Sequence, residues 1–196
     1  MVEVYLVKRE LLSGQGVEAM MRVIMKMKGY KEKIRFTYNE YNKPNLRDYP
    51  DIHFSGSHSG EYMICAISDL AVGIDIQILD MSKNGAALSK RFMSKEEHEE
   101  IVSMPLEDQM KVFYRIWTQN EAYMKYTGLG FGLPMNTFRP AKVGKNWKII
   151  NMGKMMDNIQ LESLDVAENY EAWICGEMTS PVGEIIQITE MDINGK

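Results

Sequence analysis

The chain of 196 residues is long enough for one large domain or two small lobes, and 45% of its residues are hydrophobic. Charged residues make up 26% and are mixed in sign, which excludes a wholly disordered chain. The formal net charge of -4 argues against general nucleic-acid binding, although it leaves room for a local basic site.

The composition also bears on the compartment. The N-terminal stretch MVEVYLVKRE alternates instead of forming an apolar signal core, and no apolar run approaches membrane-spanning length. Cys65 and Cys175 lie in apolar, strand-like runs whose spacing matches no zinc pattern. We therefore expect a cytoplasmic protein without a membrane partner, with two buried free thiols in a reducing compartment.

The first half of the chain is predicted to contain strands and one helix. Apolar residues recur at helical spacing over 16–28, and Gly29 is a plausible stop. Alternating or apolar runs predict four strands, at 2–8, 33–39, 62–68 and 72–77. Only Asp69, Leu70 and Ala71 separate the last two strands, so we expect a β-hairpin there.

The second half of the chain is likewise predicted to contain helices and strands. Ser94 begins SKEE, which resembles a capping box, and a longer helix is predicted over 107–127, ended by Gly128 and Gly130. Four further strands are predicted, at 147–151, 159–164, 171–177 and 184–188.

A faint internal echo links the two halves. EYMICAI at 61–67 resembles YEAWICGEM at 170–178, and a helix followed by strands occurs in each half. We therefore predict two α+β lobes of similar design, an N-terminal lobe over 1–76 and a C-terminal lobe over 77–196. A cleft between lobes is a common place for a ligand.

The run SGSHSG at 55–60 admits three interpretations. Gly and Ser favour a solvated turn for conformational reasons. A hydrolase nucleophile elbow is excluded, because His58 and not a serine lies midway between Gly56 and Gly60. The third is an anion-holding loop, in which backbone N–H groups, hydroxyls and the imidazole converge on phosphate. Taken alone, the turn is favoured.

Two predicted elements carry ionisable side chains with two possible roles. In VGIDIQ, strand alternation places Asp75 and Gln77 opposite the apolar face. A carboxylate there either pairs with a lysine or backbone donors, or binds a hard metal such as Mg²⁺. On the helix, Trp117, Glu121 and Lys125 fall along one stripe, where a surface Glu–Lys pair is the simpler interpretation.

Lys43 is the third candidate, because Pro44 restricts it to an extended conformation in which it can meet an anion. A solvated turn residue is the alternative. Together, two carboxylates that can hold Mg²⁺ and cations that can hold phosphates indicate phosphoryl-type transfer from a polyphosphate donor. The ordered set is Lys43, Ser57, His58, Asp75, Glu121 and Lys125.

At these positions the sequence resembles the 4'-phosphopantetheinyl transferases of the surfactin-type, two-lobed class. The family pattern is roughly GKP, F-N-x-S-H-S, G-I-D-x-E, W-x-x-K-E-(A/S)-x-x-K and G-x-G, with an intervening RFFS-x-x-E segment. The matching stretches here are NKP (42–44), FSGSHS (54–59), GIDIQ (73–77), KRFMSKEE (90–97), WTQNEAYMK (117–125) and GLG (128–130).

The resemblance implies an α+β fold of two pseudo-symmetric lobes. Each lobe would hold a small, mainly antiparallel sheet and a long helix, with the active site between the lobes. It also implies Mg²⁺-dependent transfer of the 4'-phosphopantetheine arm of coenzyme A to a serine of an acyl or peptidyl carrier protein. Adenosine 3',5'-bisphosphate would be released.

The resemblance assigns roles to individual residues. Asp75 and Glu121 would hold Mg²⁺, with Gln77 as a third ligand that acts directly or through water. Glu121 would also deprotonate the carrier serine. The remaining assignments concern coenzyme A: His58 and Lys125 would contact its phosphates with Ser57 beside them, and Lys43 would lie near its nucleotide.

Three positions depart from the family pattern. Gln77 replaces a second strand carboxylate, and Asn120 replaces the lysine before the catalytic Glu. No counterpart of an early arginine-rich helix is evident, and Lys8, Arg9 and Arg22 are candidate substitutes. The alternative hypotheses are a relative that binds coenzyme A or a carrier protein without transfer, and an α+β interaction protein without a ligand.

Overall fold

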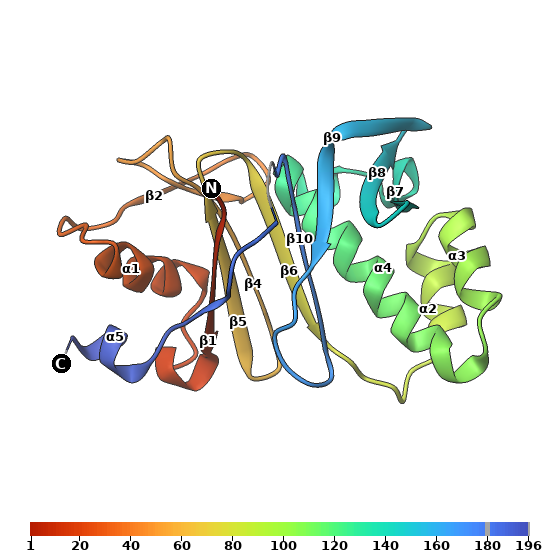
Figure 1. The fold of residues 1–196 in the computed structure, drawn as a ribbon, viewed down its shortest axis with the longest axis horizontal. Coiled ribbons are helices and arrows are strands. Elements are labelled where there is room, and N and C mark those ends of the chain that lie inside the picture. The colour runs from red at the N-terminus through yellow and green to blue at the C-terminus, as the bar shows by residue number, and fades with distance from the viewer. Residues whose placement is uncertain (179–180, 196) are drawn as a thin grey trace.

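The structure, a computed structural model, describes residues 1–178 and 181–195. It is an α+β fold in which two sheets lie between helices α1 and α4 (Figure 1). The apolar faces of the two sheets share one core, to which β1 and β5 contribute from the first sheet and β6 and β10 from the second. This layered arrangement confirms the predicted α+β fold.

The first sheet has the strand order β11-β1-β5-β4. Its bounds are β1 Glu3–Lys8, β4 His53–Ser59, β5 Tyr62–Ser68 and β11 Ile186–Gln187. β1 and β4 pair antiparallel with β5, whereas the short β11 pairs parallel with β1. Helix α1 (Val17–Met27) packs its Met and Ile side chains on the outer face of this sheet. Between β1 and β4 the chain also forms the 3-10 helix η1 (Arg9–Leu12) and a small antiparallel ribbon of β2 (Phe36–Tyr38) and β3 (Pro44–Leu46).

The second sheet is an antiparallel meander with the order β6-β10-β9-β8-β7. Its bounds are β6 Val72–Ile78, β7 Phe138–Val143, β8 Asn146–Asn151, β9 Lys154–Ser163 and β10 Tyr170–Gly176. The 22-residue helix α4 (Leu106–Thr127) covers its outer face. The other helices are α2 Gly85–Phe92, α3 Lys95–Val102, η2 Gly130–Gly132, η3 Met135–Thr137 and α5 Glu190–Asn194.

The chain passes between the two sheets twice. It leaves the first sheet at 69–71 and returns after β10 to form β11. Both crossings meet the second sheet at the same end: the first enters it at Val72, the second leaves it at Gly176, and these two residues are paired. At the opposite end, the Tyr170 hydroxyl accepts a hydrogen bond from the Glu61 N–H at 2.9 Å. The boundary between residues 76 and 77 stays a prediction; β6 pairs within the second sheet.

Local sequence signals predicted most helices correctly. Ser94 caps α3 through a reciprocal capping box with Glu97. α4 ends at Gly128, whose φ of 72° is left-handed and suits glycine. Helices α2 and α5 and strands β3 and β7 were not predicted. A proline at position 140 weakens the strand pattern of β7, which is an edge strand.

The predicted β-hairpin between 62–68 and 72–77 is wrong. β5 pairs with β1 and β4, while β6 pairs with β10 in the other sheet. The short connection turns the chain from one sheet into the other, so that Ile74 and Ile76 pack against Ile64 and Ala66 across the shared core. The turn interpretation of the Gly/Ser run is also wrong, because residues 53–59 form strand β4 and the turn itself is Gly60–Glu61.

The two echo sequences occupy equivalent strands. EYMICAI includes β5, next to the edge strand β4, and YEAWICG includes β10, next to the edge strand β6. Within the described residues Cys65 and Cys175 are free and fully buried, as expected, and burial raises the pKa of Cys65 to about 12. In the same part of the chain, no helix combines the length and apolar character that crossing a membrane requires.

Candidate functional site

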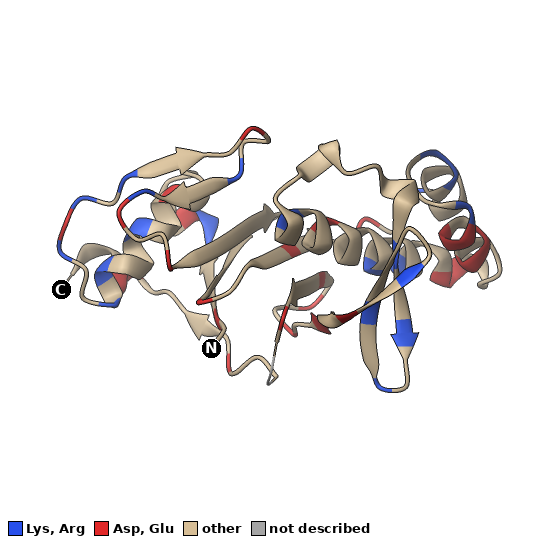
Figure 2. Cartoon of the chain, turned by 90° about the horizontal axis from the view of Figure 1, so that it is seen from above, with Lys and Arg blue, Asp and Glu red and all other residues tan. Residues whose placement is uncertain are grey.

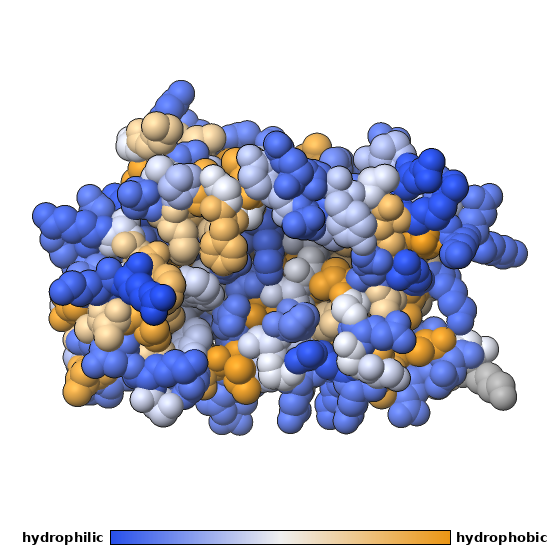
Figure 3. Space-filling view, turned by 180° about the vertical axis from the view of Figure 1, so that it is seen from behind, coloured by the Kyte–Doolittle hydropathy of each residue, from blue (hydrophilic) through white to orange (hydrophobic). Residues whose placement is uncertain are grey.

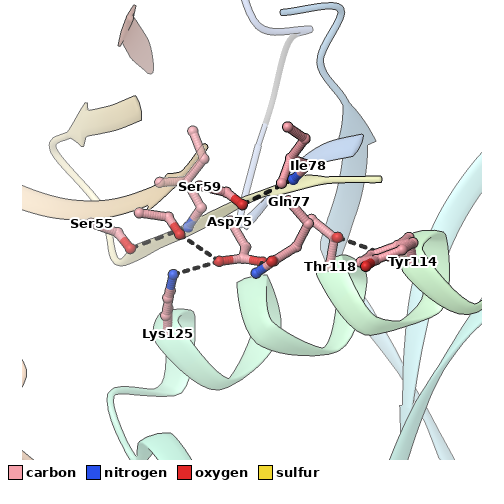
Figure 4. Close-up of polar contacts among 10 residues, drawn as sticks. Ser55, Ser59, Asp75, Gln77, Ile78, Tyr114, Thr118 and Lys125 are labelled. Carbon is pink, nitrogen blue, oxygen red and sulfur yellow. Dashed lines mark hydrogen bonds and ion pairs between the residues drawn. The ribbon is translucent and has the colours of Figure 1, made fainter. Parts of the chain in front are cut away.

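The candidate site lies where edge strand β4 of the first sheet runs beside edge strand β6 of the second. Ser57 on β4 is buried and donates from its hydroxyl to Asp75 Oδ1 at 2.6 Å. Figure 4 shows Asp75 and its contact with Lys125, with α4 passing beneath the strands. Two of the predicted site residues, 18 positions apart in sequence, thus meet across the junction of the sheets.

Asp75 is the centre of this cluster and is only 1% exposed. Lys125 Nζ lies 2.6 Å from its Oδ1, and Gln77 Nε2 donates to its Oδ2 at 3.0 Å. With Ser57, three side chains therefore satisfy the buried carboxylate, as a buried charge requires. Lys125 pairs with Asp75, so the structure does not support the simpler expectation of a surface Glu121–Lys125 pair.

Gly73 allows α4 to approach β6 this closely. A Cβ atom added at Gly73 would lie 2.0 Å from the Ala122 carbonyl oxygen and 2.3 Å from the Tyr126 nitrogen. Only glycine leaves room for the backbone of α4 at this point. The close approach lets Glu121 and Lys125, one helical turn apart, reach the Asp75 side of the strand.

Glu121 is half-buried beside Asp75 and Lys125. Burial raises the pKa of its carboxyl group, the charge of Asp75 raises it further, and Lys125 opposes the change. Two neighbouring carboxylates in a partly desolvated place repel each other, and a cation between them would relieve that repulsion.

The residues present fit a Mg²⁺ ion. Mg²⁺ commonly takes one or two carboxylates and completes its shell with water and substrate phosphates. Asp75 and Glu121 would supply the carboxylates, and the amide of Gln77 would offer a further ligand oxygen. Within the described residues no set of three or more His, Cys, Asp or Glu groups is placed to hold a metal ion.

Lys43 is bonded to backbone carbonyl oxygens of α4 and β6. Its Nζ donates to the carbonyl oxygens of Lys125 at 2.5 Å and of Val72 at 3.3 Å. The ammonium group thus meets the carboxyl-terminal end of α4, where cations are favoured. Burial lowers the pKa of Lys43 to about 8.

A cavity of about 650 Å³ adjoins the cluster. Its walls come from the start of α1, the loop before β3, strand β4 and the end of α4. They include Arg22, Lys43, Ser55, Lys125 and the aromatic rings of Tyr38, Tyr41 and Phe54. Viewed from behind, the surface of the molecule is hollowed near its middle (Figure 3). The cavity combines cations with flat apolar groups.

His58 projects from the opposite face of β4 to Ser57 and is exposed. Burial lowers its pKa, and the neighbouring Arg9 and Lys125 charges lower it further. Arg9 donates to the Gly60 carbonyl oxygen at 3.1 Å, while Arg22 lines the cavity. The structure therefore brings Ser57, Asp75 and Lys125 into direct contact and leaves His58 beside them.

The sequence analysis did not predict the structural roles of Ser55, Ser59 and Asn120 in this region. Ser55 and Ser59 both accept hydrogen bonds from β6, a role that the S-x-S-x-S spacing of a strand would have indicated. Asn120 is fully buried and donates to the buried Glu97 carboxylate at 2.7 Å, which ties α4 to α3. Figure 2 shows acidic residues in red on the short helices at the end of the molecule away from the chain termini.

Comparisons with known proteins identify the family of the chain. Residues 71–175 match the 4'-phosphopantetheinyl transferase superfamily, a stretch that includes Asp75, Glu121 and Lys125. The chain is 38% identical to 4'-phosphopantetheinyl transferase Sfp of Bacillus subtilis (strain 168) over 108 residues, which are 55% of this chain and 47% of Sfp.

Two further relatives extend the similarity. The 4'-phosphopantetheinyl transferase psf-1 of Bacillus pumilus is 34% identical over 146 residues, 74% of this chain and 61% of psf-1. The 4'-phosphopantetheinyl transferase gsp of Aneurinibacillus migulanus is 31% identical over 162 residues, 83% of this chain and 65% of gsp. The chain thus spans about half to two thirds of the length of these relatives. Because the superfamily match covers more than half of it, the chain belongs to the 4'-phosphopantetheinyl transferase superfamily.

Proposed function

We propose that this protein transfers the 4'-phosphopantetheine arm of coenzyme A to a serine hydroxyl of an acyl or peptidyl carrier protein. The observation that carries the proposal is the meeting of Asp75 with Lys125, beside Glu121, at the junction of the two sheets. This arrangement provides carboxylates, a cation and a neighbouring cavity in the matched part of the chain.

Coenzyme A would bind in the cavity beside the junction. Tyr38, Tyr41 and Phe54 offer flat apolar surface for a base, and the basic side chains at the cavity suit phosphate groups. Lys125 and His58, with the Ser57 hydroxyl nearby, would contact the phosphates. Lys43 would act near the nucleotide mainly by holding its loop against α4, since its ammonium group already bonds two carbonyl oxygens.

Asp75 and Glu121, with Gln77 directly or through water, would hold Mg²⁺. The ion would neutralise charge on the pyrophosphate of coenzyme A. Glu121 would take the proton from the carrier serine, because a base whose pKa is raised toward neutrality accepts a proton more effectively. The serine oxygen then bonds to the phosphorus that carries pantetheine, and adenosine 3',5'-bisphosphate leaves with the electrons of the broken P–O bond.

The carrier would belong to fatty-acid, polyketide or nonribosomal peptide synthesis, which takes place in the cytoplasm. The direct test incubates the protein with coenzyme A, Mg²⁺ and apo carriers of these three kinds. We expect each accepted carrier to gain the mass of phosphopantetheine. Asp75→Asn should lose the transfer, whereas Asp108→Asn, which alters only an exposed pair with Lys111, should retain it. No mass gain on any carrier would contradict the proposal.

A second candidate function is binding of coenzyme A or a carrier protein without transfer. Gln77 favours it, because its amide donates to Asp75 where the family pattern has a second carboxylate. Calorimetry distinguishes the two functions. Mg²⁺-dependent binding of coenzyme A without any modified carrier would support the binding function and exclude the transferase.

A further inference from the structure

Strands β4 and β6 lie side by side without a shared backbone ladder. The ladder partner of β4 is β5, and the described ladder partner of β6 is β10. The N–H groups of β6 that face β4 therefore need other acceptors, since buried backbone donors are normally paired.

Two serine side chains supply acceptors for two of these N–H groups. The Ile74 N–H donates to Ser55 Oγ at 3.1 Å, and the Ile78 N–H donates to Ser59 Oγ at 2.9 Å. Both pairs are 19 residues apart, so β4 and β6 run in the same direction with constant register. Figure 4 shows both side chains reaching from β4 to β6.

Ser57 lies between them on the same side of β4, because alternate residues of a strand share a side. At the same offset it would be level with Ile76, yet its hydroxyl donates to the Asp75 carboxylate. A hydroxyl can accept or donate, and the three serines divide these roles. The outer two fix the register of the strands, and the central one orients the carboxylate.

We propose that Ser55 and Ser59 are positioning residues for the metal-binding carboxylates. Their hydroxyls hold β6 against β4 at a fixed register, so that Asp75 stays in contact with Ser57 and Lys125 and beside Glu121. This inference rests on the proposed function, and it assigns to both serines a role in metal affinity that acts through Asp75. Neither serine is a ligand of the metal.

The test measures Mn²⁺ binding by electron paramagnetic resonance, with no coenzyme A or carrier present. The double variant Ser55→Ala/Ser59→Ala should bind Mn²⁺ about tenfold more weakly, as loss of groups that orient metal ligands typically does. Hydrogen exchange at the Ile74 and Ile78 amides should accelerate in the same variant. Ser59→Thr, which keeps the hydroxyl, should retain the wild-type affinity.

Ser89→Ala is the matched control. Ser89 is fully buried and hydrogen-bonded to Ala86 and His98, and it lies on α2, outside the contact between β4 and β6. It should lower the melting temperature without changing Mn²⁺ affinity, which separates positioning from general stability. If the double variant does not fold, the half-buried Ser59→Ala alone gives the same comparison with Ser59→Thr.

The outcomes separate this inference from the proposed function. A wild-type protein that binds Mn²⁺ but modifies no carrier contradicts the transferase and leaves the inference intact. Suppose instead that the wild-type protein is an active transferase and that its folded serine variants bind Mn²⁺ within about twofold of the wild-type affinity. This result overturns the inference alone, because removing groups that orient the metal ligands should weaken metal binding more than that. A wild-type protein without Mn²⁺ binding overturns the inference whatever its activity.

Discussion

Asp75 carries a negative charge at a place that is almost closed to solvent. A buried carboxylate is tolerated only where donors and opposite charge replace water, and here Ser57, Gln77 and Lys125 do so. Lys125 is the only one of the three that also balances the charge. The ion pair therefore decides both the stability of the junction and its electrostatics.

Lys125→Met should destabilise the protein by about 3 kcal/mol, because it leaves a buried carboxylate without its counter-ion. Mg²⁺ should restore part of this loss by neutralising Asp75. Thermal unfolding with and without millimolar Mg²⁺ measures both effects. Lys111→Met, which removes an exposed pair with Asp108, should change little in either condition. An equal deficit at all Mg²⁺ concentrations would show that the ion does not reach Asp75.

Glu121→Gln should lower transfer at least about a hundredfold, as expected for loss of a general base. It should also stabilise the metal-free protein near pH 7.5. The folded-state pKa of Glu121 is raised above its ordinary value of 4.5, so folding disfavours the charged form. Wild-type stability from this group is therefore lost as pH rises through the folded pKa, and the variant avoids that loss.

Denaturant unfolding between pH 5 and pH 8 checks this sign. The stability advantage of Glu121→Gln should shrink as pH falls toward the ordinary pKa, because the wild-type carboxyl group then becomes protonated in the folded state and increasingly so in the unfolded state. Glu107→Gln, at an exposed position on the same helix, should show no such trend. A Glu121→Gln variant with full activity would exclude Glu121 as the base.

At the scale of elements, the contact of α4 with β6 depends on one absent side chain. Gly73→Ala would place a methyl group against the backbone of α4, which cannot move aside as a flexible side chain could. We expect a loss of at least about 3 kcal/mol and weaker metal binding, measured by denaturant unfolding and Mn²⁺ titration. Gly183→Ala, where nothing lies within 4 Å, should be nearly neutral.

The sequence predicted elements well where the signal is local. The apolar periodicity of α1, the capping box of α3 and the glycine stop of α4 are properties of neighbouring residues. β4 was mistaken for a turn because its Gly and Ser residues have weak strand preference. Its conformation comes from tertiary contacts: Gly56 packs against Val17, and the serines bond to β6.

In the candidate site, too, the residue types were predictable from the sequence but the tertiary contacts were not. Residue types and their order predicted the carboxylates and cations of the cluster, and the structure places Asp75 with Ser57 and Lys125. The contacts of Lys43 could not be predicted, because its carbonyl partners lie on β6 and α4, far along the chain. The side on which His58 projects likewise required knowing that β4 is a strand.

At the scale of the whole molecule, the C-terminal segment completes the first sheet. The Ile188 N–H donates to the Leu6 carbonyl oxygen at 2.8 Å, and the Ile188 side chain is buried in the core under α1. Removing residues 184–196 should expose the edge of β1, lower the melting temperature and promote aggregation. Met191→Ser, on the exposed side of α5, should do neither. Light scattering during thermal unfolding measures both effects, and an unaffected truncation would show that β11 is dispensable.

The two connections between the sheets both meet the second sheet at one end, where Val72 pairs with Gly176. Any rotation of one sheet relative to the other would therefore have its axis near that end. Displacement grows with distance from the axis, so the contact of Tyr170 with Glu61 would separate first and that of Ser55 with Ile74 last. Asp75, three residues from Val72, would move little. The two sheets are thus connected so that widening of the far end would leave the charged centre nearly stationary.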